Sequence, residues 1–267
     1  MKASDVGFSG SIPALYHQYL GPLLFEPYAQ DLAERAGADA PRRILETAAG
    51  TGIVTEALAR RLPEAEIVAT DLNQAMLDIA AARLGGGRVE WRPADAHDLP
   101  FEDARFDAVV CQFGAMFFPD RGRAYGEALR VLRPGGRFLF NVWDSLEANP
   151  VSSAAAQAVA RLFPDDPPSF LERVPFGYHK VTAIEADLKA AGFASVAAET
   201  VVLSSRVTPA EAAAGLCLGS PLRSEIEARD GGRLDEAVAA ASEAIGAALG
   251  GSSEARMSAH VFTARKG

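Results

Sequence analysis

The stretch Ile44-Leu45-Glu46-Thr47-Ala48-Ala49-Gly50-Thr51-Gly52 decides the fold of this chain. Its apolar start predicts a short strand over 43–47, and the small residues that follow predict a tight turn before a helix over 53–61. Small residues let a ligand approach the backbone of such a turn, and the first turn of the helix offers free N–H donors. The stretch therefore indicates a strand–turn–helix unit with a ligand at its turn, although tight packing alone would also explain the small residues.

The same alternation of strand and helix extends along the chain. Further strands are expected over 66–70, 89–92, 106–111, 137–143, 196–207 and 257–266, with helices over 73–84, 121–132 and 182–191. Strands that alternate with helices indicate a parallel sheet covered by helices on both faces. The expected fold is α/β: a doubly wound, mostly parallel, seven-stranded sheet with helical lid insertions.

Three segments fall outside this alternation. Two short helices are expected over 12–37, where Gly21 and Pro22 interrupt the apolar pattern. Segment 145–180 is rich in proline, and segment 208–255 is rich in alanine and helical, with breaks at 219–221 and 231–232. We interpret residues 1–267 as a single domain with a ligand-binding core over 42–144. Segment 12–37 would cap the site, and the other two would form a lid that selects the substrate.

The composition excludes several classes of protein. The net charge of −9 and the isoelectric point near 5.0 argue against a nucleic-acid or anionic-membrane surface, because phosphates are bound by clustered Lys and Arg. Two cysteines and four scattered histidines predict neither a disulfide framework nor a metal site. No apolar tract is long enough for a bilayer and no leader pattern is visible, so a cytoplasmic location is expected. The sequence carries no signal of an oligomeric state.

Three acidic residues end or follow consecutive predicted strands, at the edge where open α/β sheets bind ligands. Glu46 suits a ligand ammonium and would repel a pyrophosphate. Asp71 could accept hydrogen bonds from a ribose diol, or it could complement the dipole of the next helix. Asp95 could accept from an adenine amino group, or it could cap a turn. Each feature alone is weak, but their order and spacing together are far less likely to arise by accident.

At this point the chain resembles the class I S-adenosylmethionine (SAM) dependent methyltransferases, in the group of the ubiquinone-biosynthesis C-methyltransferases and many small-molecule enzymes. The resemblance covers about 42–144 and rests on five motifs: Ile44-Leu45-Glu46-Thr47-Ala48-Ala49-Gly50-Thr51-Gly52, Thr70-Asp71-Leu72, Ala94-Asp95-Ala96 through Leu99-Pro100-Phe101, Phe106-Asp107-Ala108-Val109-Val110, and Leu132-Arg133-Pro134-Gly135-Gly136. It implies a Rossmann-like methyltransferase fold, SAM as cofactor with S-adenosylhomocysteine as product, and no metal.

The resemblance also implies a set of cofactor-binding residues. Glu46 would contact the methionine ammonium, and Ala48, Gly50 and Gly52 would contact the methionine chain. Asp71 would bind the ribose, Leu72 and Met76 would pack on the adenosine, and Asp95 and Ala96 would contact the adenine. Gln112 and Phe113 would lie at the sulfonium. The family usually has glycine at the position of Ala48. A methyl group fits there only at negative φ, so a slightly altered turn with retained binding is expected.

The remaining candidates lie outside the cofactor motifs. Tyr16 and Tyr19 would close the SAM site, and Met116, Phe117 and Trp143 would line an apolar substrate pocket; packing is the alternative for all five. Ser220, at the break in the second lid segment, could face the pocket or simply form a helix–helix turn.

The histidines are the last group of candidates. His17 and His179 are possible general bases, since histidine titrates near neutral pH. Packing is the alternative for both, and His97 is expected to be a solvated loop residue.

The leading hypothesis is methyl transfer from SAM to a small-molecule acceptor by direct in-line displacement, with the acceptor atom open. A dinucleotide-dependent oxidoreductase of the NAD type shares the acid after the second strand. Glu46 and the turn Pro134-Gly135-Gly136 argue against it. A non-catalytic SAM-binding protein is a third reading, which only a measurement of turnover distinguishes.

Overall fold

The computed structural model describes Asp5 and residues 10–85 and 87–267; positions 1–4, 6–9 and 86 lie outside the described residues. The chain divides into two compact units. The sheet unit holds Tyr28–Val142, His179–Val201 and Ala259–Gly267, and the helical unit holds Met1–Pro27, Trp143–Tyr178 and Val202–Ser258. The expectation of a single domain over 1–267, with a cap over 12–37, a core over 42–144 and lid segments over 145–180 and 208–255, stays a prediction.

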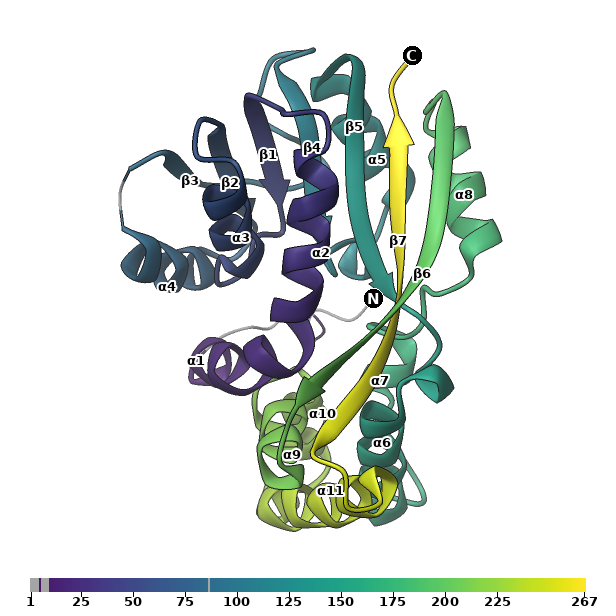
Figure 1. Ribbon diagram of the computed structural model, residues 1–267. Coiled ribbons are helices and arrows are strands. Elements are labelled where there is room, and N and C mark those ends of the chain that lie inside the picture. The colour runs from purple at the N-terminus through teal and green to yellow at the C-terminus, as the bar shows by residue number, and fades with distance from the viewer. Residues whose placement is uncertain (1–4, 6–9, 86) are drawn as a thin grey trace. The chain divides into compact units, whose positions relative to one another are not determined.

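A seven-stranded sheet runs in the order β3-β2-β1-β4-β5-β7-β6 (Figure 1). The strands are β1 (Arg43–Thr47), β2 (Glu66–Asp71), β3 (Val89–Pro93), β4 (Phe106–Gln112), β5 (Leu132–Trp143), β6 (Ser195–Arg206) and β7 (Glu254–Arg265). The first five pair in parallel. Hydrogen bonds join 135 to 266 and 194 to 265, but 144 to 258 and 207 to 253, so β7 runs antiparallel to both its neighbours. The predicted mostly parallel, seven-stranded sheet is confirmed.

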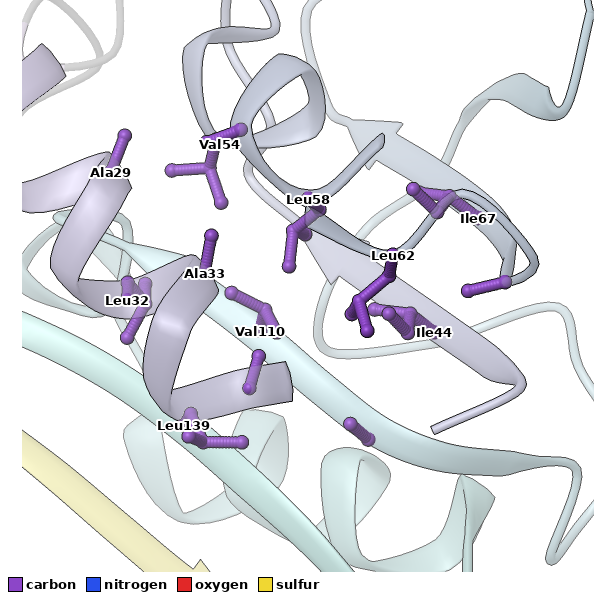
Figure 2. Packing of buried hydrophobic residues seen from close by; sticks show 14 of the residues in the cluster. Ala29, Leu32, Ala33, Ile44, Val54, Leu58, Leu62, Ile67, Val110 and Leu139 are labelled. Carbon is purple, nitrogen blue, oxygen red and sulfur yellow. The ribbon is translucent and has the colours of Figure 1, made fainter. Parts of the chain in front are cut away.

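Helices cover both faces of the sheet unit. They are α2 (Glu26–Gly37), α3 (Ile53–Arg61), α4 (Gln74–Leu84), α5 (Arg121–Val131) and α8 (Val181–Ala190). On one face, Leu32 of α2 and Leu58 of α3 pack over Ile44, Val110 and Leu139 of the sheet (Figure 2). These helices form because their apolar residues recur on one side, and burial of that side stabilises them more than helix propensity does.

The opposite face is built from aromatic rings. Tyr125 of α5 is fully buried and packs on Phe138 and Phe140 of β5, with ring centroids 5.7 and 5.5 Å apart. Phe193, which follows α8, stacks on Phe138 at 6.0 Å. The central strands β4 and β5 are therefore buried on both faces, which explains their near-continuous apolar sequences.

The helical unit contains residues 12–27 of the expected cap, residues 145–178 of the first expected lid segment and all of the second. Its helices are α1 (Ile12–Leu15), η2 (Tyr16–Phe25), η4 (Leu146–Ala148), α6 (Pro150–Leu162), α7 (Phe170–Arg173), α9 (Pro209–Leu218), α10 (Leu222–Asp230), η5 (Gly231–Arg233) and α11 (Leu234–Leu249). The breaks expected at 219–221 and 231–232 separate α9, α10 and α11, as the sequence indicated. The side chain of Thr208 and that of Glu211 form a capping box that starts α9.

The N-terminal segment differs from the expectation of two short helices. One helical run passes from α1 through the π-helix η2 into α2, and Pro22 lies inside η2. The π-turns are i→i+5, and the N–H of Glu26 donates to the carbonyl of Gly21. Leu20, Leu23 and Leu24 are buried, and this burial offsets the backbone donor that Pro22 lacks.

The strand β5 also begins earlier than expected, at Leu132 instead of 137. Gly135 takes φ +75°, and its N–H donates to the carbonyl of Lys266. Lys266 in turn donates its N–H to the carbonyl of Gly136. The Pro-Gly-Gly turn therefore pairs with the C-terminal residues, a partner that local sequence does not reveal.

Candidate functional site

The C-terminal ends of β1, β2, β3 and β4 share one edge of the sheet because these strands are parallel. Glu46 of β1 lies in register with Ala69 of β2 and Val110 of β4. The turn after β1 is fastened to β2, since the N–H of Ala49 donates to the carbonyl of Thr70 at 2.9 Å. The edge thus brings the ends of consecutive strands together, as open α/β sheets do at their ligand sites.

Gly52 closes this turn and begins α3. It takes φ +79°, and a Cβ atom there would stand 3.0 Å from the Cβ of Ala80 and 3.1 Å from the ring of Trp91. Both the backbone conformation and the close approach of α4 and β3 therefore require glycine. The helix start behind it leaves backbone N–H groups near the strand ends.

Glu46 is a buried carboxyl group at the end of β1, with 1% of its surface exposed. The hydroxyl of Thr55, on the first turn of α3, donates to its Oε2 at 2.7 Å. Burial, with a smaller contribution from the nearby carboxylate of Asp71, raises the pKa of Glu46 to about 8, against the lowering effect of the Thr55 hydrogen bond. A ligand cation would stabilise the ionised form, so the site suits an ammonium group. Thr55 was not singled out from the sequence.

Asp71 holds the turn together from the end of β2. Its Oδ2 accepts the N–H of Gly50 and its Oδ1 accepts the N–H of Asn73, each at 2.8 Å. Burial raises the pKa of Asp71 in spite of these two hydrogen bonds. Asn73 caps α4 by accepting the N–H of Ala75, so Asp71 connects the glycine turn to a helix start. The carboxylate therefore has a structural role as well as the predicted role toward a ribose.

Asp95 follows β3, with Ala96 beside it. Burial raises the pKa of Asp95, but the backbone and side-chain hydrogen bonds from His97 outweigh it, and the pKa is lowered overall. His97 Nδ1 lies 2.6 Å from Oδ1 of Asp95. The expectation that His97 is a solvated loop residue is wrong, since only 13% of its side chain is exposed and its ring packs edge-on against Phe118.

Ala48 contradicts the expectation of a negative φ, because it takes φ +54°. Alanine therefore stands here in the left-handed conformation that favours glycine. Room for the extra methyl group comes from Gly114, where a Cβ atom would stand only 2.5 Å from the Cβ of Ala48. A non-glycine residue in this conformation costs roughly 1–2 kcal/mol, which the surrounding structure must supply. This pairing with Gly114 was not predicted from the sequence.

Phe113 directly follows Gln112, the last residue of β4, and it takes φ +51°. Its N–H donates to both oxygens of Asn141 on β5, to Oδ1 at 3.0 Å and to the carbonyl at 3.2 Å. Asn141 is fully buried and stands in register with Gln112. Two neighbouring strand ends therefore carry left-handed non-glycine residues, a feature common at functional sites. Asn141 is a further residue that the sequence analysis missed.

The other residues of the sheet unit that were predicted for the site lie in the segments that follow β2 and β4. Leu72 is an apolar side chain with 67% of its surface exposed, next to Asp71. Met76 is buried, with its Cε 3.7 Å from the position of a Cβ on Gly50. Met116 and Phe117 lie on the short helix η3 (Ala115–Phe117) directly after β4; Met116 is buried and Phe117 half-buried. The exposed Leu72 is the position where a bound adenosine would cover apolar surface.

Several candidates lie in the helical unit. Tyr16, His17 and Tyr19 lie half-buried on η2, where the ring of Tyr16 stacks on Phe25 at 4.8 Å. Trp143 is buried between Phe25, at 6.3 Å, and Phe176, at 6.0 Å.

Ser220 has local partners within the helical unit: its hydroxyl donates to the carbonyl of Leu216 and accepts the N–H of Leu222. This geometry is that of a helix–helix turn. His179, half-buried, belongs to the sheet unit just before α8. The roles of these residues toward cofactor, substrate or proton stay predictions.

Within the described residues, no group of three or more His, Cys, Asp or Glu side chains is placed to hold a metal ion. Nor does any helix of that part of the chain have the length and apolar character needed to cross a membrane.

The seven-stranded, mostly parallel sheet with flanking helices is the Rossmann-like fold of solved methyltransferases. Residues 45–140 match the family described as "Methyltransferase domain". Phosphoethanolamine N-methyltransferase 2 of Haemonchus contortus, solved with SAM, superimposes with a TM-score of 0.65 over 100% of this chain and 60% of that chain. Its sequence identity of 18% makes this a likeness of fold alone.

Curated relatives are similar over part of the chain. A demethylmenaquinone methyltransferase of Deinococcus radiodurans is 41% identical over 133 residues, which are 49% of this chain and 53% of that protein. A ubiquinone/menaquinone biosynthesis C-methyltransferase of Idiomarina loihiensis is 40% identical over 102 residues, 36% of this chain and 41% of that protein. The chain therefore spans about half the length of the curated relatives it matches. These relatives agree with the resemblance to the quinone-biosynthesis group.

Proposed function

We propose that this protein transfers a methyl group from SAM to a small-molecule acceptor. The observation that carries the proposal is the buried carboxyl of Glu46. Among the described residues its side chain accepts one hydrogen bond, from the hydroxyl of Thr55 at 2.7 Å. A buried carboxyl next to a second acid is costly unless a cation binds. The ammonium of a methionine group supplies that cation, whereas a pyrophosphate would add repulsion.

The remaining strand ends fit the other parts of the same molecule. Ala48, Gly50 and Gly52 would hold the methionine chain through their backbones, and the carboxylates of Asp71 and Asp95 would bind ribose and adenine. Leu72 and Met76 would pack on the adenosine, with Ala96 beside the adenine. Gln112 and Phe113 would lie at the sulfonium. When bound, SAM supplies an electrophilic methyl group, and the task of the chain is to bind and orient both reactants.

No nucleophilic side chain is required for this reaction, because the acceptor itself attacks the methyl group. An O, N or S acceptor must lose a proton, and His17 or His179 is proposed as the base. Met116, Phe117, Trp143 and Ser220 are proposed for acceptor binding, and Tyr16 and Tyr19 for closing the SAM site. We further propose that turnover needs no metal, and that the protein binds neither nucleic acid nor membranes and works in the cytoplasm.

The acceptor class is proposed from the relatives. Two of them are named for methylation in menaquinone or ubiquinone synthesis, so a hydroquinone or phenol is the first class to test. Met116, a buried apolar side chain directly after β4, supports an acceptor with apolar surface.

Titration calorimetry with S-adenosylhomocysteine and with NAD tests the cofactor, and tighter binding of NAD would reject the proposal. Transfer of a labelled methyl group from SAM to a panel of hydroquinones, phenols, amines and thiols tests the activity. Binding of S-adenosylhomocysteine with no transfer to any of them would favour a non-catalytic SAM-binding protein. Full loss of transfer with a chelator, restored by magnesium, would contradict the metal-free reaction.

A further inference from the structure

The two oxygens of the Asp95 carboxylate have different surroundings. Oδ1 accepts the backbone N–H of His97 at 2.9 Å and lies 2.6 Å from Nδ1 of the same residue. A carboxylate only accepts hydrogen bonds, so the proton of this pair belongs to Nδ1. Among the residues that the structure describes, none donates a hydrogen bond to Oδ2. One oxygen is therefore held within the protein, and the other is available to a ligand.

His97 is itself held in place. Its ring contacts Phe118 edge-on, with ring centroids 5.4 Å apart and an interplanar angle of 71°. Phe118 is buried, and 13% of the imidazole side chain is exposed. Nε2 is buried and has no hydrogen-bond partner within the described part of the chain. The ring therefore has one polar contact, which is Asp95, and its other side is fixed by packing.

The loop that follows His97 is tied to α5. Glu127 accepts the N–H of Leu99 at 2.7 Å, and Arg130 donates to the carbonyls of Leu99 at 2.9 Å and Phe101 at 2.7 Å. Arg130 also bonds Glu127, so the two side chains act as one clamp on the loop. The backbone between Asp95 and Phe101 thus has fixed points beyond His97. The orientation of the Asp95 carboxylate is set by His97, and that of His97 by its surroundings.

We propose that His97 is a positioning residue for cofactor selectivity: by fixing Oδ1 of Asp95 it aims Oδ2 at the exocyclic amino group of a 6-aminopurine. This inference rests on the proposed function, because it assumes that the adenine of SAM binds beside Asp95. An ionised, oriented carboxylate accepts a hydrogen bond from an amino group and repels a 6-oxo group. His97 therefore increases discrimination between 6-amino and 6-oxo purines, and it does so through Asp95, without touching the ligand.

Two substitutions separate the hydrogen bond from the packing. In H97N, the amide nitrogen takes the place of Nδ1, so the donor to Asp95 is kept. In H97L, a side chain of similar reach keeps the apolar contact with Phe118 but cannot donate. H97A removes the donor without adding bulk, and it replaces H97L if circular dichroism or thermal melting shows that the leucine variant has lost its fold. D95A shows how well the protein still discriminates between 6-amino and 6-oxo purines when the carboxylate is absent.

The readout is the ratio of two dissociation constants measured by calorimetry, for S-inosylhomocysteine and for S-adenosylhomocysteine. In the inosyl compound an oxygen replaces the 6-amino group. The wild-type ratio is expected to exceed that of D95A by about tenfold or more, as for one hydrogen bond to a charged group. H97L is expected to move most of the way to the D95A value, and H97N to stay within about threefold of wild type, because an amide donor remains.

An H97L ratio equal to that of wild type would overturn the inference, as would equal weakening of both ligands, which would mean that His97 only supports the fold. A wild-type protein that binds neither ligand would instead reject the proposed function, and the inference with it. A wild-type protein that binds S-adenosylhomocysteine, with an unchanged ratio in H97L and H97A, rejects the role of His97 alone.

Discussion

At the scale of single residues, Glu46 couples the charge of the site to pH. A free glutamate has a pKa of 4.5, and burial, with help from Asp71, raises that of Glu46 to about 8. Between these two values the unfolded chain is ionised at this position while the folded, ligand-free protein holds the proton. The free energy of unfolding therefore falls as pH rises from 4.5 toward 8, and the loss is complete above the folded pKa.

The substitution E46Q removes this penalty, because an amide is a neutral group of the same shape. The free energy of unfolding of E46Q relative to wild type is expected to grow between pH 5 and 8, by at most about 1.4 kcal/mol per pH unit, and to level off above. Urea denaturation at four pH values measures it without ligand. E64Q, at an exposed carboxylate, is the matched control. Parallel profiles for E46Q and wild type would show that Glu46 is ionised in the free protein.

Ala48 and Gly114 form a second residue-scale test. In G114A, the new Cβ atom would meet the Cβ of Ala48 at 2.5 Å and Sγ of Cys111 at 2.7 Å. Overpacking of this kind costs roughly 1–3 kcal/mol. Removing the methyl group of Ala48 relieves one of the two clashes, so G114A is expected to cost about 1 kcal/mol less in an A48G background. A double-mutant cycle by urea denaturation measures this coupling. The same cost in both backgrounds would mean that the two residues do not touch.

The sequence predicted the acidic residues of the site but not the groups that orient them. Glu46, Asp71 and Asp95 stand out because each ends or follows an apolar strand. Asn141, in contrast, looks like one polar residue inside an apolar strand, and its role appears only when β5 stands beside β4. The positive φ of Ala48 was missed for the same reason. It depends on Gly114, which lies 66 positions further along the chain (114 − 48).

At the scale of elements, the sequence predicted the bounds of a strand or helix correctly where the residues of that segment determine them. The bounds expected for β1 and α3 are those observed, and α4 begins one residue after its expected start. Elements whose ends depend on a partner were less predictable. β5 begins early because its turn pairs with the C-terminal residues. The π-helix η2 passes through Gly21 and Pro22 because tertiary burial outweighs two residues that favour a break.

Within the helical unit, α9 lies against η2 at two glycines spaced by four residues. A Cβ atom at Gly215 would stand 2.6 Å from Cδ2 of Leu20 and 3.0 Å from the Cβ of Tyr19. At Gly219 the obstacles are backbone atoms, with the nitrogen of Tyr16 at 2.9 Å. Side-chain ends can move aside but backbone cannot, so Gly219 limits how closely α9 and η2 approach. Close packing against α9 therefore holds the π-helix that carries Tyr16, His17 and Tyr19.

G219A is expected to destabilise the protein by roughly 1–3 kcal/mol, because the added methyl group must push α9 away from η2. G246A is the matched control. Its Cβ atom would meet only Pro209, at 3.7 Å, which is ordinary contact inside the helix α11. Alanine is favoured over glycine there by roughly 0.5–1 kcal/mol, so this variant should be more stable than wild type. Thermal and urea denaturation compare the two. A stable G219A would show that η2 and α9 are not tightly packed.

At the scale of the whole molecule, the division into units separates the proposed tasks. Every strand-end residue proposed for the cofactor lies in the sheet unit, which also contains the matched methyltransferase segment. Trp143, Ser220 and the η2 residues lie in the helical unit. The similarity to curated relatives covers 133 residues in the Deinococcus case, about half of this chain. Cofactor use and acceptor choice can therefore be tested in different parts of the sequence.

Replacing 215–222 by a neutral linker tests this separation. The segment ends α9, contains Ser220 and includes both glycines that contact η2, so its loss disturbs the helical unit. The dissociation constant of S-adenosylhomocysteine is expected to stay within about tenfold, roughly 1.4 kcal/mol, because Glu46, Asp71 and Asp95 belong to the sheet unit. Methyl transfer to the acceptor found for wild type should fall much further. Calorimetry and the transfer assay measure the two effects, and D71A, with weakened cofactor binding, is the opposite control. Equal loss of both activities would mean that 215–222 supports the fold as a whole and does not select the acceptor.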